Sequence, residues 1–391
     1  MDKVKLGIIG IGNMGSAHVN NLVAGKCPEI ELVAVADIRP QRLEWAKTKK
    51  EDVACFNTAE EMLDSGLIDA CLVAVPHYDH PRYVMEALKR GIHAMCEKPA
   101  GVYTKQVKEM NAAAKEAGVT FGMMFNQRTN PMYIKMHELM ASGELGEVHR
   151  TNWIITDWYR PQYYYDSGAW RATWSGEGGG VLLNQCPHNL DLWQWICGMP
   201  KTVDVKLHFG KWHDIEVEDD VTAYVEYENG ASGMFITSTG DCPGSNRFEV
   251  CCDRGTMVAE GRTLKITRLK EAMSEYTGEE RGAFSAPERE VETITFDNDG
   301  DQHVGVLNAF AGNILHGTPL VADGTEGING LTISNAMHLS AFTGRKVELP
   351  FDDDEYYEEL MKRVATSRRK ENVKEVVSDT SASYKGANGG K

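Results

Sequence analysis

The chain has 391 residues, 42% hydrophobic and 25% charged, which are ordinary fractions for a globular protein and exclude disordered and collagen-like classes. This length predicts two domains, each large enough to bury a core. Asp and Glu total 57 against 41 Lys and Arg, so the formal net charge is -16, which disfavours nucleic acid as a partner.

Short apolar runs alternate with amphipathic segments in the first third of the chain. The runs at 4–9, 32–36, 70–75, 94–96 and 120–124 predict buried strands. Helical patterns lie between them at about 13–25, 40–49, 79–90 and 104–117. This rhythm predicts an α/β domain with a doubly wound parallel sheet, a Rossmann fold, whose ligands bind at the carboxyl ends of the strands.

The pattern changes after about residue 150. Residues 221–227 alternate with period two, Asn229-Gly230 is a hairpin signal, and 231–237 supply the return strand. Further strands are predicted at 247–252, 256–259 and 264–267, followed by helices at 305–316 and 327–342. We therefore expect an α+β second domain with a large, mostly antiparallel open sheet, whose uncovered face suits self-association into a dimer or tetramer.

A glycine motif, Gly10-x-Gly12-x-x-Gly15, stands between the first predicted strand and the first helix. Its glycines allow a tight turn, a close approach of the backbone to a pyrophosphate and close helix packing, with the anion at the helix N-terminus. Asn13 and Met14 lie inside the motif and are predicted to line the same cofactor. Alone, the motif also fits an ordinary glycine-rich turn.

The end of the second predicted strand strengthens that interpretation. Asp37 lies where a carboxylate accepts hydrogen bonds from the adenosine ribose, and it would repel a 2′-phosphate. We therefore predict NAD rather than NADP, with Ile38 and Arg39 beside it. Arg39 keeps NADP as an alternative, because its guanidinium suits a phosphate.

Two later strand ends carry polar residues that should face the same crevice. Pro76, His77 and His80 follow the fourth strand and are predicted to line the cofactor, although His80 also suits a structural role at a helix start. Glu97 and Lys98 follow the fifth strand. An ammonium there can orient a substrate hydroxyl or stabilise an alkoxide, and the alternative is an ordinary surface lysine.

These motifs together resemble the Gfo/Idh/MocA oxidoreductases over residues 3–350. The resemblance rests on the glycine motif, Asp37, the Pro76 loop, Glu97-Lys98-Pro99, and Gly178-Gly179-Gly180-Val181-Leu182-Leu183-Asn184-Gln185-Cys186-Pro187-His188. The family includes inositol dehydrogenases and glucose-fructose oxidoreductase. The resemblance therefore implies an NAD-dependent dehydrogenase that acts on a ring hydroxyl of a sugar, cyclitol or glycoside.

The residues after the three glycines are predicted to form one helix over 181–195, so that Asn184 and His188 share a face. By resemblance, the family lysine corresponds to Lys98 and the active-site histidine to His188. Asn184 stands where the inositol dehydrogenases have an aspartate, and it cannot add a negative charge. His188 is then the favoured general base, and we predict a catalytic set of Lys98, His188 and Asn184 without a metal.

An aromatic segment precedes the glycines. Aromatic rings stack on the apolar faces of sugar rings, whereas the alternative is that these residues pack the domain interface. From this segment Tyr159, Tyr163, Trp170 and Arg171 are predicted to contact substrate, and Asn126 and Arg128 after the sixth strand are predicted to join them. The segment contains Trp153, Asp157, Trp158, Tyr159, Arg160, Tyr163, Tyr164, Tyr165, Trp170, Arg171 and Trp174.

We therefore expect an NAD-binding domain at 1–126, a substrate-binding and oligomerisation domain at 127–370, and a flexible tail at 371–391. Two other functions stay open: an enzyme that keeps and internally recycles its NAD, and a non-catalytic NAD-binding regulator. The chain has no run of roughly 20 apolar residues that could cross a bilayer. Its nine cysteines contain no Cys-x-x-Cys pair, so a cytoplasmic protein with reduced thiols is expected.

Overall fold

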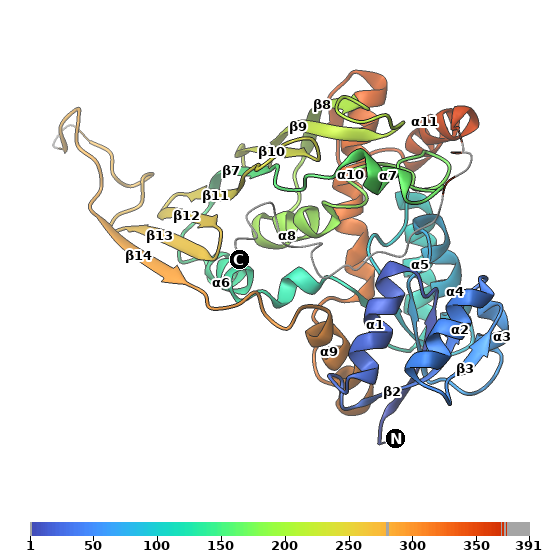
Figure 1. Cartoon of the computed structure of the whole chain (residues 1–391). Helices are drawn as coiled ribbons and strands as arrows, with labels where there is room; N and C mark the ends of the chain where they lie inside the picture. Colours follow the sequence, from blue (N-terminus) through green and yellow to red (C-terminus); the bar gives the residue numbers. More distant parts are fainter. Residues whose placement is uncertain (1, 279–280, 369, 371–372, 374–391) are drawn as a thin grey trace.

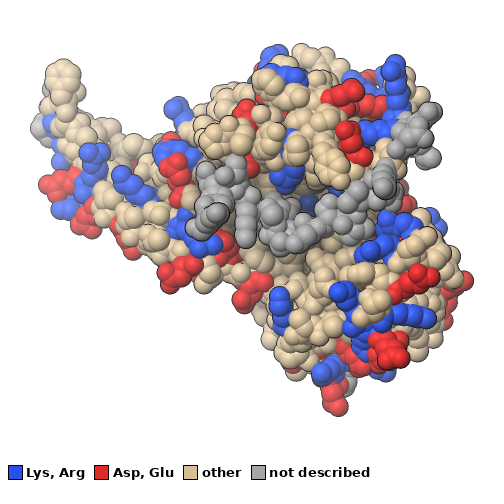
Figure 2. All heavy atoms as spheres, viewed as in Figure 1, with Lys and Arg blue, Asp and Glu red and all other residues tan. Residues whose placement is uncertain are grey.

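The computed structural model describes residues 2–278, 281–368, 370 and 373, so the tail predicted at 371–391 lies outside the described residues except for Val373. Two domains lie one above the other in Figure 1, and the hairpin of β13 (Thr263–Leu269) and β14 (Arg289–Thr295) extends away from both. In Figure 2, basic and acidic side chains are interspersed over both domains on the face shown. Within the described ranges, no helix is long and apolar enough to span a bilayer.

The first domain is built on a six-stranded parallel sheet with the order β3-β2-β1-β4-β5-β6. This confirms the predicted Rossmann fold and every predicted strand and helix, and it adds the short β3 and α3. Its elements are β1 (Val4–Ile9), α1 (Asn13–Val23), β2 (Ile30–Ala36), α2 (Pro40–Lys49), β3 (Ala54–Phe56), α3 (Ala59–Leu63), β4 (Ala70–Val73), η1 (His77–Asp79), α4 (His80–Lys89), β5 (His93–Cys96), α5 (Thr104–Ala117) and β6 (Phe121–Met123).

The second domain contains a nine-stranded sheet with the order β14-β13-β12-β11-β7-β10-β9-β8-β15. All neighbouring strands are antiparallel except β7 and β10, which run parallel. The elements are η2 (Asn126–Thr129), α6 (Pro131–Ala141), β7 (Val148–Ile155), α7 (Gln162–Asp166), α8 (Pro187–Cys197), β8 (Thr202–Phe209), β9 (Glu218–Glu226), β10 (Ser232–Ser238), β11 (Asn246–Cys252), β12 (Gly255–Glu260), β13 (Thr263–Leu269), β14 (Arg289–Thr295), α9 (Gln302–His316), η4 (Gly324–Glu326), α10 (Gly327–Thr343), β15 (Val347–Glu348) and α11 (Asp353–Thr366).

Helices α8 and α10 pack against each other on one side of this sheet, and Figure 1 shows both between the sheet and the first domain. Helix α9 instead returns to the first domain, where Val306, Leu307 and Phe310 belong to the same buried cluster as β1. The chain after β14 therefore contributes to both cores, so the second predicted domain is continuous in sequence but shares a helix with the first.

The predicted helix over 181–195 is wrong at its beginning. Residues 181–186 form turns, and α8 begins only at Pro187, whose missing N–H suits the first helical position. The preceding backbone is held by Glu218 of β9, whose carbonyl accepts from the Val181 N–H at 3.0 Å. Its Oε1 also accepts from the N–H groups of Gly180 and Leu182 at 2.8 and 3.0 Å. These bonds to β9 replace the ones that a helix would make.

Candidate functional site

The glycine motif has the geometry that a dinucleotide requires. Gly10 has φ +85°, a conformation that side chains disfavour. A Cβ on Gly15 would lie 2.0 Å from the Gly10 carbonyl oxygen, so only glycine lets α1 start here. A Cβ on Gly12 would meet a single atom within 4 Å, on the Arg39 side chain at 3.8 Å. The backbone at Gly12 is thus open to an anion at the α1 N-terminus, which fits the pyrophosphate of NAD.

Asp37 is buried beside this loop at the end of β2. Its Oδ2 accepts from the Ile11 N–H at 2.9 Å, and its Oδ1 accepts from Arg39 N and Nε at 2.9 and 3.1 Å. Arg42, which the sequence did not single out, donates from Nε to the Ile11 carbonyl at 2.8 Å. The carboxylate therefore fixes the backbone of the glycine loop and also binds Arg39. Ile38 is 85% exposed next to it.

The two histidines after β4 differ in their environments. The ring nitrogens of His80 lie 2.7 Å from the carbonyl oxygens of Val75 and Pro99, so this buried side chain joins the ends of β4 and β5. These contacts fit the structural alternative for His80, and its predicted contact with the cofactor stays a prediction. His77 is also buried, with Nδ1 at 3.3 Å from the Glu177 carbonyl, and its ring lies edge-on to Trp170.

Glu97 forms a buried pair behind the site. Its Oε1 lies 2.6 Å from His18 Nε2 of α1, and the ring of His303, from α9, lies edge-on to His18. Burial raises the pKa of Glu97, but the hydrogen bond and charge of His18, with the charges of His303 and Lys98, lower it to about 2. Glu97 is therefore a carboxylate at neutral pH, and it joins β5 to α1 and α9.

Lys98 connects the two domains. Its Nζ donates to the backbone carbonyl of Asn184 at 2.7 Å, across the boundary between β5 and the residues before α8. Burial lowers the pKa of Lys98, while Glu97 and Glu177 raise it. One of the three ammonium protons is thus used within the protein, which fixes the direction of the side chain and leaves two donors for a ligand.

His188 lies in the first turn of α8 and is 2% exposed. Burial, followed by the charges of Lys98 and His303, holds its pKa well below the ordinary value of a histidine. The influence of Lys98 means that the amine of the first domain and the imidazole of the second lie close enough to act on each other. The imidazole is consequently neutral at pH 7 and able to accept a proton.

The aromatic segment divides between core and site. Trp153 is fully buried and stacks on Phe248 at 4.2 Å, so it packs the sheet. Tyr164, rather than the predicted Tyr163, reaches Asn184, since its hydroxyl lies 3.3 Å from Asn184 Oδ1. Tyr163 is 65% exposed.

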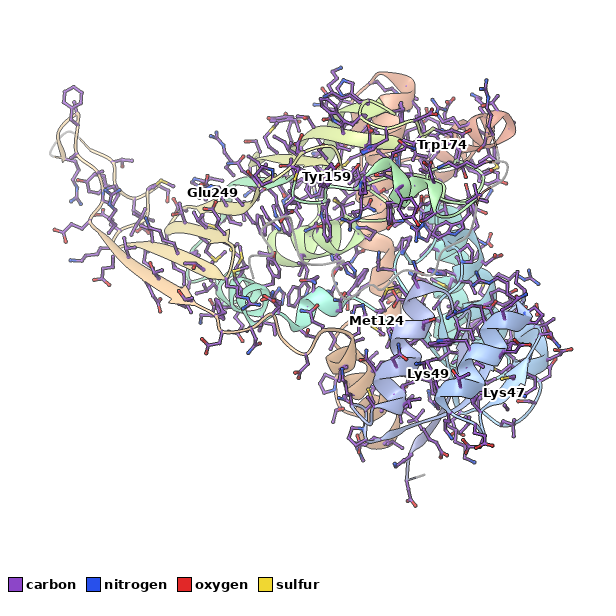
Figure 3. All side chains as sticks on the ribbon, in the orientation of Figure 1. Lys47, Lys49, Met124, Tyr159, Trp174 and Glu249 are labelled. Atoms are coloured by element: carbon purple, nitrogen blue, oxygen red, sulfur yellow. The ribbon has the colours of Figure 1, made fainter. Side chains whose placement is uncertain are left out.

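Arg171 lies between two of these rings, with Trp170 at 4.7 Å and Tyr164 at 4.5 Å from its guanidinium carbon. It also donates to the Tyr164 hydroxyl at 2.8 Å. Tyr159 is 42% exposed. Figure 3 shows Tyr159 in the second domain and Met124, which follows β6, at the boundary between the domains. The segment therefore presents alternating aromatic and cationic groups near Asn184.

Asn126 and Arg128 have environments that the sequence did not predict. Asn126 is fully buried and donates to Gln302 Oε1 at 2.5 Å. Arg128 is 4% exposed and donates to both carboxylate oxygens of Asp191 at 2.8 and 2.6 Å, and to Glu326 at 2.7 Å. Both side chains link η2 to other elements of the fold, and their contact with substrate stays a prediction.

Sequence reasoning also missed a carboxylate. Glu177, directly before the three glycines, is 2% exposed, and its side chain accepts from the Asn184 amide and from the Ala172 N–H, the latter at 2.5 Å. Its position next to a glycine run, seven residues from Asn184, was a signal available in the sequence. Among the described residues, no three His, Cys, Asp or Glu side chains gather as metal ligands.

Two domain profiles match the chain. The NAD-binding Rossmann domain of the oxidoreductase family matches residues 4–125, and the Gfo/Idh/MocA C-terminal domain matches residues 133–258. The myo-inositol 2-dehydrogenase of Thermotoga maritima is 24% identical over 354 residues, which are 88% of this chain and 98% of that protein. The D-glucoside 3-dehydrogenase of Escherichia coli is 24% identical over 369 residues, covering 88% and 97%.

The fold is also similar to a solved structure. The WlbA dehydrogenase of Bordetella pertussis, in complex with NADH and UDP-GlcNAcA, has a TM-score of 0.75 and 25% identity, covering 90% of this chain and 100% of that one. The domain profiles together span well over half of the chain and agree with the glycine motif and the buried Asp37. The protein therefore belongs to the Gfo/Idh/MocA family and is an NAD-binding oxidoreductase.

Proposed function

We propose that this protein oxidises a secondary ring hydroxyl of a sugar, cyclitol or glycoside to the ketone, reversibly and with NAD. The observation that carries the proposal is the bond from Lys98 Nζ to the Asn184 carbonyl, because it brings an ammonium of the first domain beside the turn that leads to His188. The activities in the names of the two curated relatives, on an inositol and on a glucoside, support the substrate class.

The cofactor would lie along the carboxyl ends of the parallel strands. Gly12 and Gly15 at the N-terminus of α1 would hold the pyrophosphate, and Asp37 would accept hydrogen bonds from the adenosine ribose. Bound there, NAD supplies the hydride acceptor of the reaction. Pro76 and His77, after β4, would border the same crevice. The chain's own residues do the rest of the chemistry.

His188 would serve as the general base. Its buried neutral imidazole accepts the hydroxyl proton as the hydrogen on the same carbon leaves as hydride. Lys98 donates to the reacting oxygen and stabilises the negative charge that develops on it. In the reverse direction the same imidazole, once protonated, returns the proton to the alkoxide. Asn184 positions Lys98 through its backbone carbonyl.

The substrate ring would lie against the aromatic segment. Trp170 and Tyr164 offer ring faces to the apolar side of a pyranose or cyclitol, and Arg171 between them offers N–H donors to its hydroxyls. Tyr159 is sufficiently exposed to contact a larger substrate, such as a glycoside with an aglycone. We keep Tyr163 as a second residue of this kind, at the rim.

The first test replaces the two proposed catalytic side chains. We expect Lys98→Ala and His188→Ala each to lower kcat for sugar oxidation by roughly 10²–10⁴-fold while the Kd for NAD stays within a few-fold of the wild type. Turnover is followed as NADH absorbance over a panel of inositols, aldoses and glycosides. Lys89→Ala and His316→Ala, which change exposed residues, are the matched controls.

The same assay separates the three functions that the sequence left open. NADH that accumulates in solution supports the dehydrogenase. A spectral change that stays bound to the protein supports an enzyme that recycles its cofactor. Wild-type rates in both variants would contradict the proposed roles, and no spectral change with any polyol would favour an NAD-binding regulator.

A further inference from the structure

Glu177 is a buried carboxylate that the proposed reaction does not use. It is 2% exposed, directly precedes the three glycines, and accepts from the Asn184 side-chain amide and from the Ala172 N–H. Burial raises the pKa of Glu177 above the ordinary glutamate value, and the charge of Arg171 and the hydrogen bonds from Ala172 and Asn184 oppose that rise and favour the carboxylate. A glutamate at this position therefore calls for an explanation beyond packing.

The hydrogen bonds of Asn184 give it a fixed orientation. Its Nδ2 donates to Glu177, its Oδ1 accepts from the Tyr164 hydroxyl at 3.3 Å, and its backbone carbonyl accepts from Lys98 Nζ at 2.7 Å. A neutral tyrosine hydroxyl donates to a carbonyl oxygen, and a carboxylate accepts only from the amide nitrogen. Glu177 therefore fixes the orientation of the Asn184 side-chain amide. Asn184 is also the residue whose backbone carbonyl binds Lys98.

The charges around Lys98 show why a carboxylate matters there. Two carboxylates, Glu97 at the end of β5 and Glu177, favour its protonated form, and two guanidinium groups, Arg171 and Arg160, oppose it. Four histidine side chains also lie around Lys98, namely His77, His80, His188 and His303. Burial lowers the pKa of each, so they add little positive charge at neutral pH.

The carboxylate of Glu97 is paired with His18, whose Nε2 lies 2.6 Å from Glu97 Oε1. Glu177 is therefore the carboxylate near Lys98 that has no comparable histidine partner in the described part of the chain. At the position of Asn184, the family resemblance implies an aspartate in the inositol dehydrogenases, and the asparagine here removes that negative charge from the site.

We propose that Glu177 is a positioning residue, which orients the Asn184 amide and supplies beside Lys98 the negative charge that Asn184 cannot carry. Its carboxylate does not contact the substrate. It keeps Lys98 protonated and directed at the reacting oxygen. This role rests on the proposed function, in which Lys98 must carry its proton in order to stabilise the developing alkoxide.

The first test is Glu177→Gln, which keeps the size of the side chain and removes its charge. Because Glu177 favours the protonated amine, its loss lets Lys98 lose its proton at a lower pH. We expect the midpoint of the alkaline limb of kcat/KM to move down by roughly one pH unit, with the acid limb unchanged. The Kd for NAD and the thermal unfolding temperature are measured alongside to show that the variant folds.

The second test returns the charge to the neighbouring position. In Glu177→Gln/Asn184→Asp, the new carboxylate lies on the residue that holds Lys98, and we expect the alkaline midpoint to return to the wild-type value or above it. The matched control is Asp219→Asn, which removes the charge of another buried carboxylate, one that holds the backbone of Trp212 and His213. That variant should lose stability without moving the midpoint.

A second readout does not depend on turnover. The rate at which Lys98 reacts with dinitrofluorobenzene, followed by peptide mass spectrometry against pH, reports the protonation of its amine directly. If no sugar is oxidised, the proposed function fails, yet this titration still decides the role of Glu177. An identical midpoint in the wild type and in Glu177→Gln would overturn the inference, as would a double variant that fails to restore the shift.

Discussion

At the level of single residues, burial determines which groups carry charge in this site. His188 and His77 are enclosed by protein, so their pKa values fall well below that of a free histidine and both rings are neutral at pH 7. Glu97 is equally buried but is bound to His18, and its pKa falls to about 2. Burial therefore keeps the His188 imidazole neutral, whereas Glu97 stays a carboxylate because its hydrogen bond and charge interaction with His18 help to outweigh the effect of burial.

The lowered pKa of His188 gives a pH dependence with a definite sign. Below its pKa the imidazole is protonated and cannot accept a proton, so His188 should stop oxidation at acidic pH. We expect kcat/KM to stay level from about pH 8 down to about pH 6.5, the ordinary histidine value, and to fall below it. A pH–rate profile with the acid midpoint above that value would contradict the assignment of His188 as base.

Asp37 allows a second prediction at this scale. Its carboxylate should exclude the 2′-phosphate of NADP, and it holds Arg39 through two hydrogen bonds. In Asp37→Ser we expect NAD to bind roughly tenfold more weakly, because one or two hydrogen bonds to the cofactor are lost. We expect NADP to bind more tightly, because the Arg39 side chain is released from the carboxylate. Isothermal titration of both cofactors checks this, and an unchanged ratio of the two Kd values would contradict it.

At the scale of elements, the approach to α8 depends on backbone packed closely against β9. A Cβ on Gly180 would lie 2.0 Å from the Glu218 carbonyl oxygen, which belongs to a strand in the sheet and cannot move aside. The turn at 181–186 and the start of α8 at Pro187 follow from this contact. The position of Asn184 and His188 is therefore set by contact with the first residue of β9 and only in part by helix geometry.

Gly180→Ala tests this connection. We expect it to lower the free energy of unfolding by about 1–3 kcal/mol, the usual cost of overpacking, and to lower kcat because Asn184 and His188 shift. Gly179→Ala is the matched control, since its Cβ would meet only side-chain atoms, of Leu183 and His338, and no backbone of β9. Equal losses in the two variants, measured by thermal unfolding, would show that contact with β9 is not what matters.

At the scale of the whole molecule, the nine-stranded sheet has one face covered by helices and one that is partly exposed. On the outer face, Ile154 and Tyr224 are 37% and 42% exposed, and Met234 and Ile236 lie between them in register. Neighbouring apolar side chains on three central strands form a patch of the kind that protein interfaces cover. The homo-oligomer expected from the sequence would use this face.

Ile236→Glu tests that expectation. A charge in the centre of the patch should dissociate the assembly without unfolding the domain, because Ile236 is directed away from the core. We expect the wild type to sediment as a dimer or tetramer and the variant as a smaller species. The control is Val291→Glu, because Val291 lies on the outer strand β14 and is 56% exposed. A monomeric wild type in analytical ultracentrifugation would contradict the expectation.

The sequence alone determined much of the first domain. Its strands are buried on both faces, so they appear as short apolar runs, and the glycine motif stands between such a run and a helical pattern. The hairpin at Asn229-Gly230 was equally readable, because a short turn is a local property. Lys98 was singled out by its position after a predicted strand and His188 by the family resemblance, and their catalytic roles stay predictions.

The tertiary structure decided what depends on contacts between distant residues. β7 pairs in parallel with β10, and no local pattern specifies that partner. The sequence did not indicate that Asp191 and Glu326 bind Arg128, or that the Glu177 carboxylate accepts from the Asn184 amide. Local periodicity in the sequence indicates whether a segment forms a helix or a strand. The charge state and orientation of a side chain depend instead on which distant groups surround it.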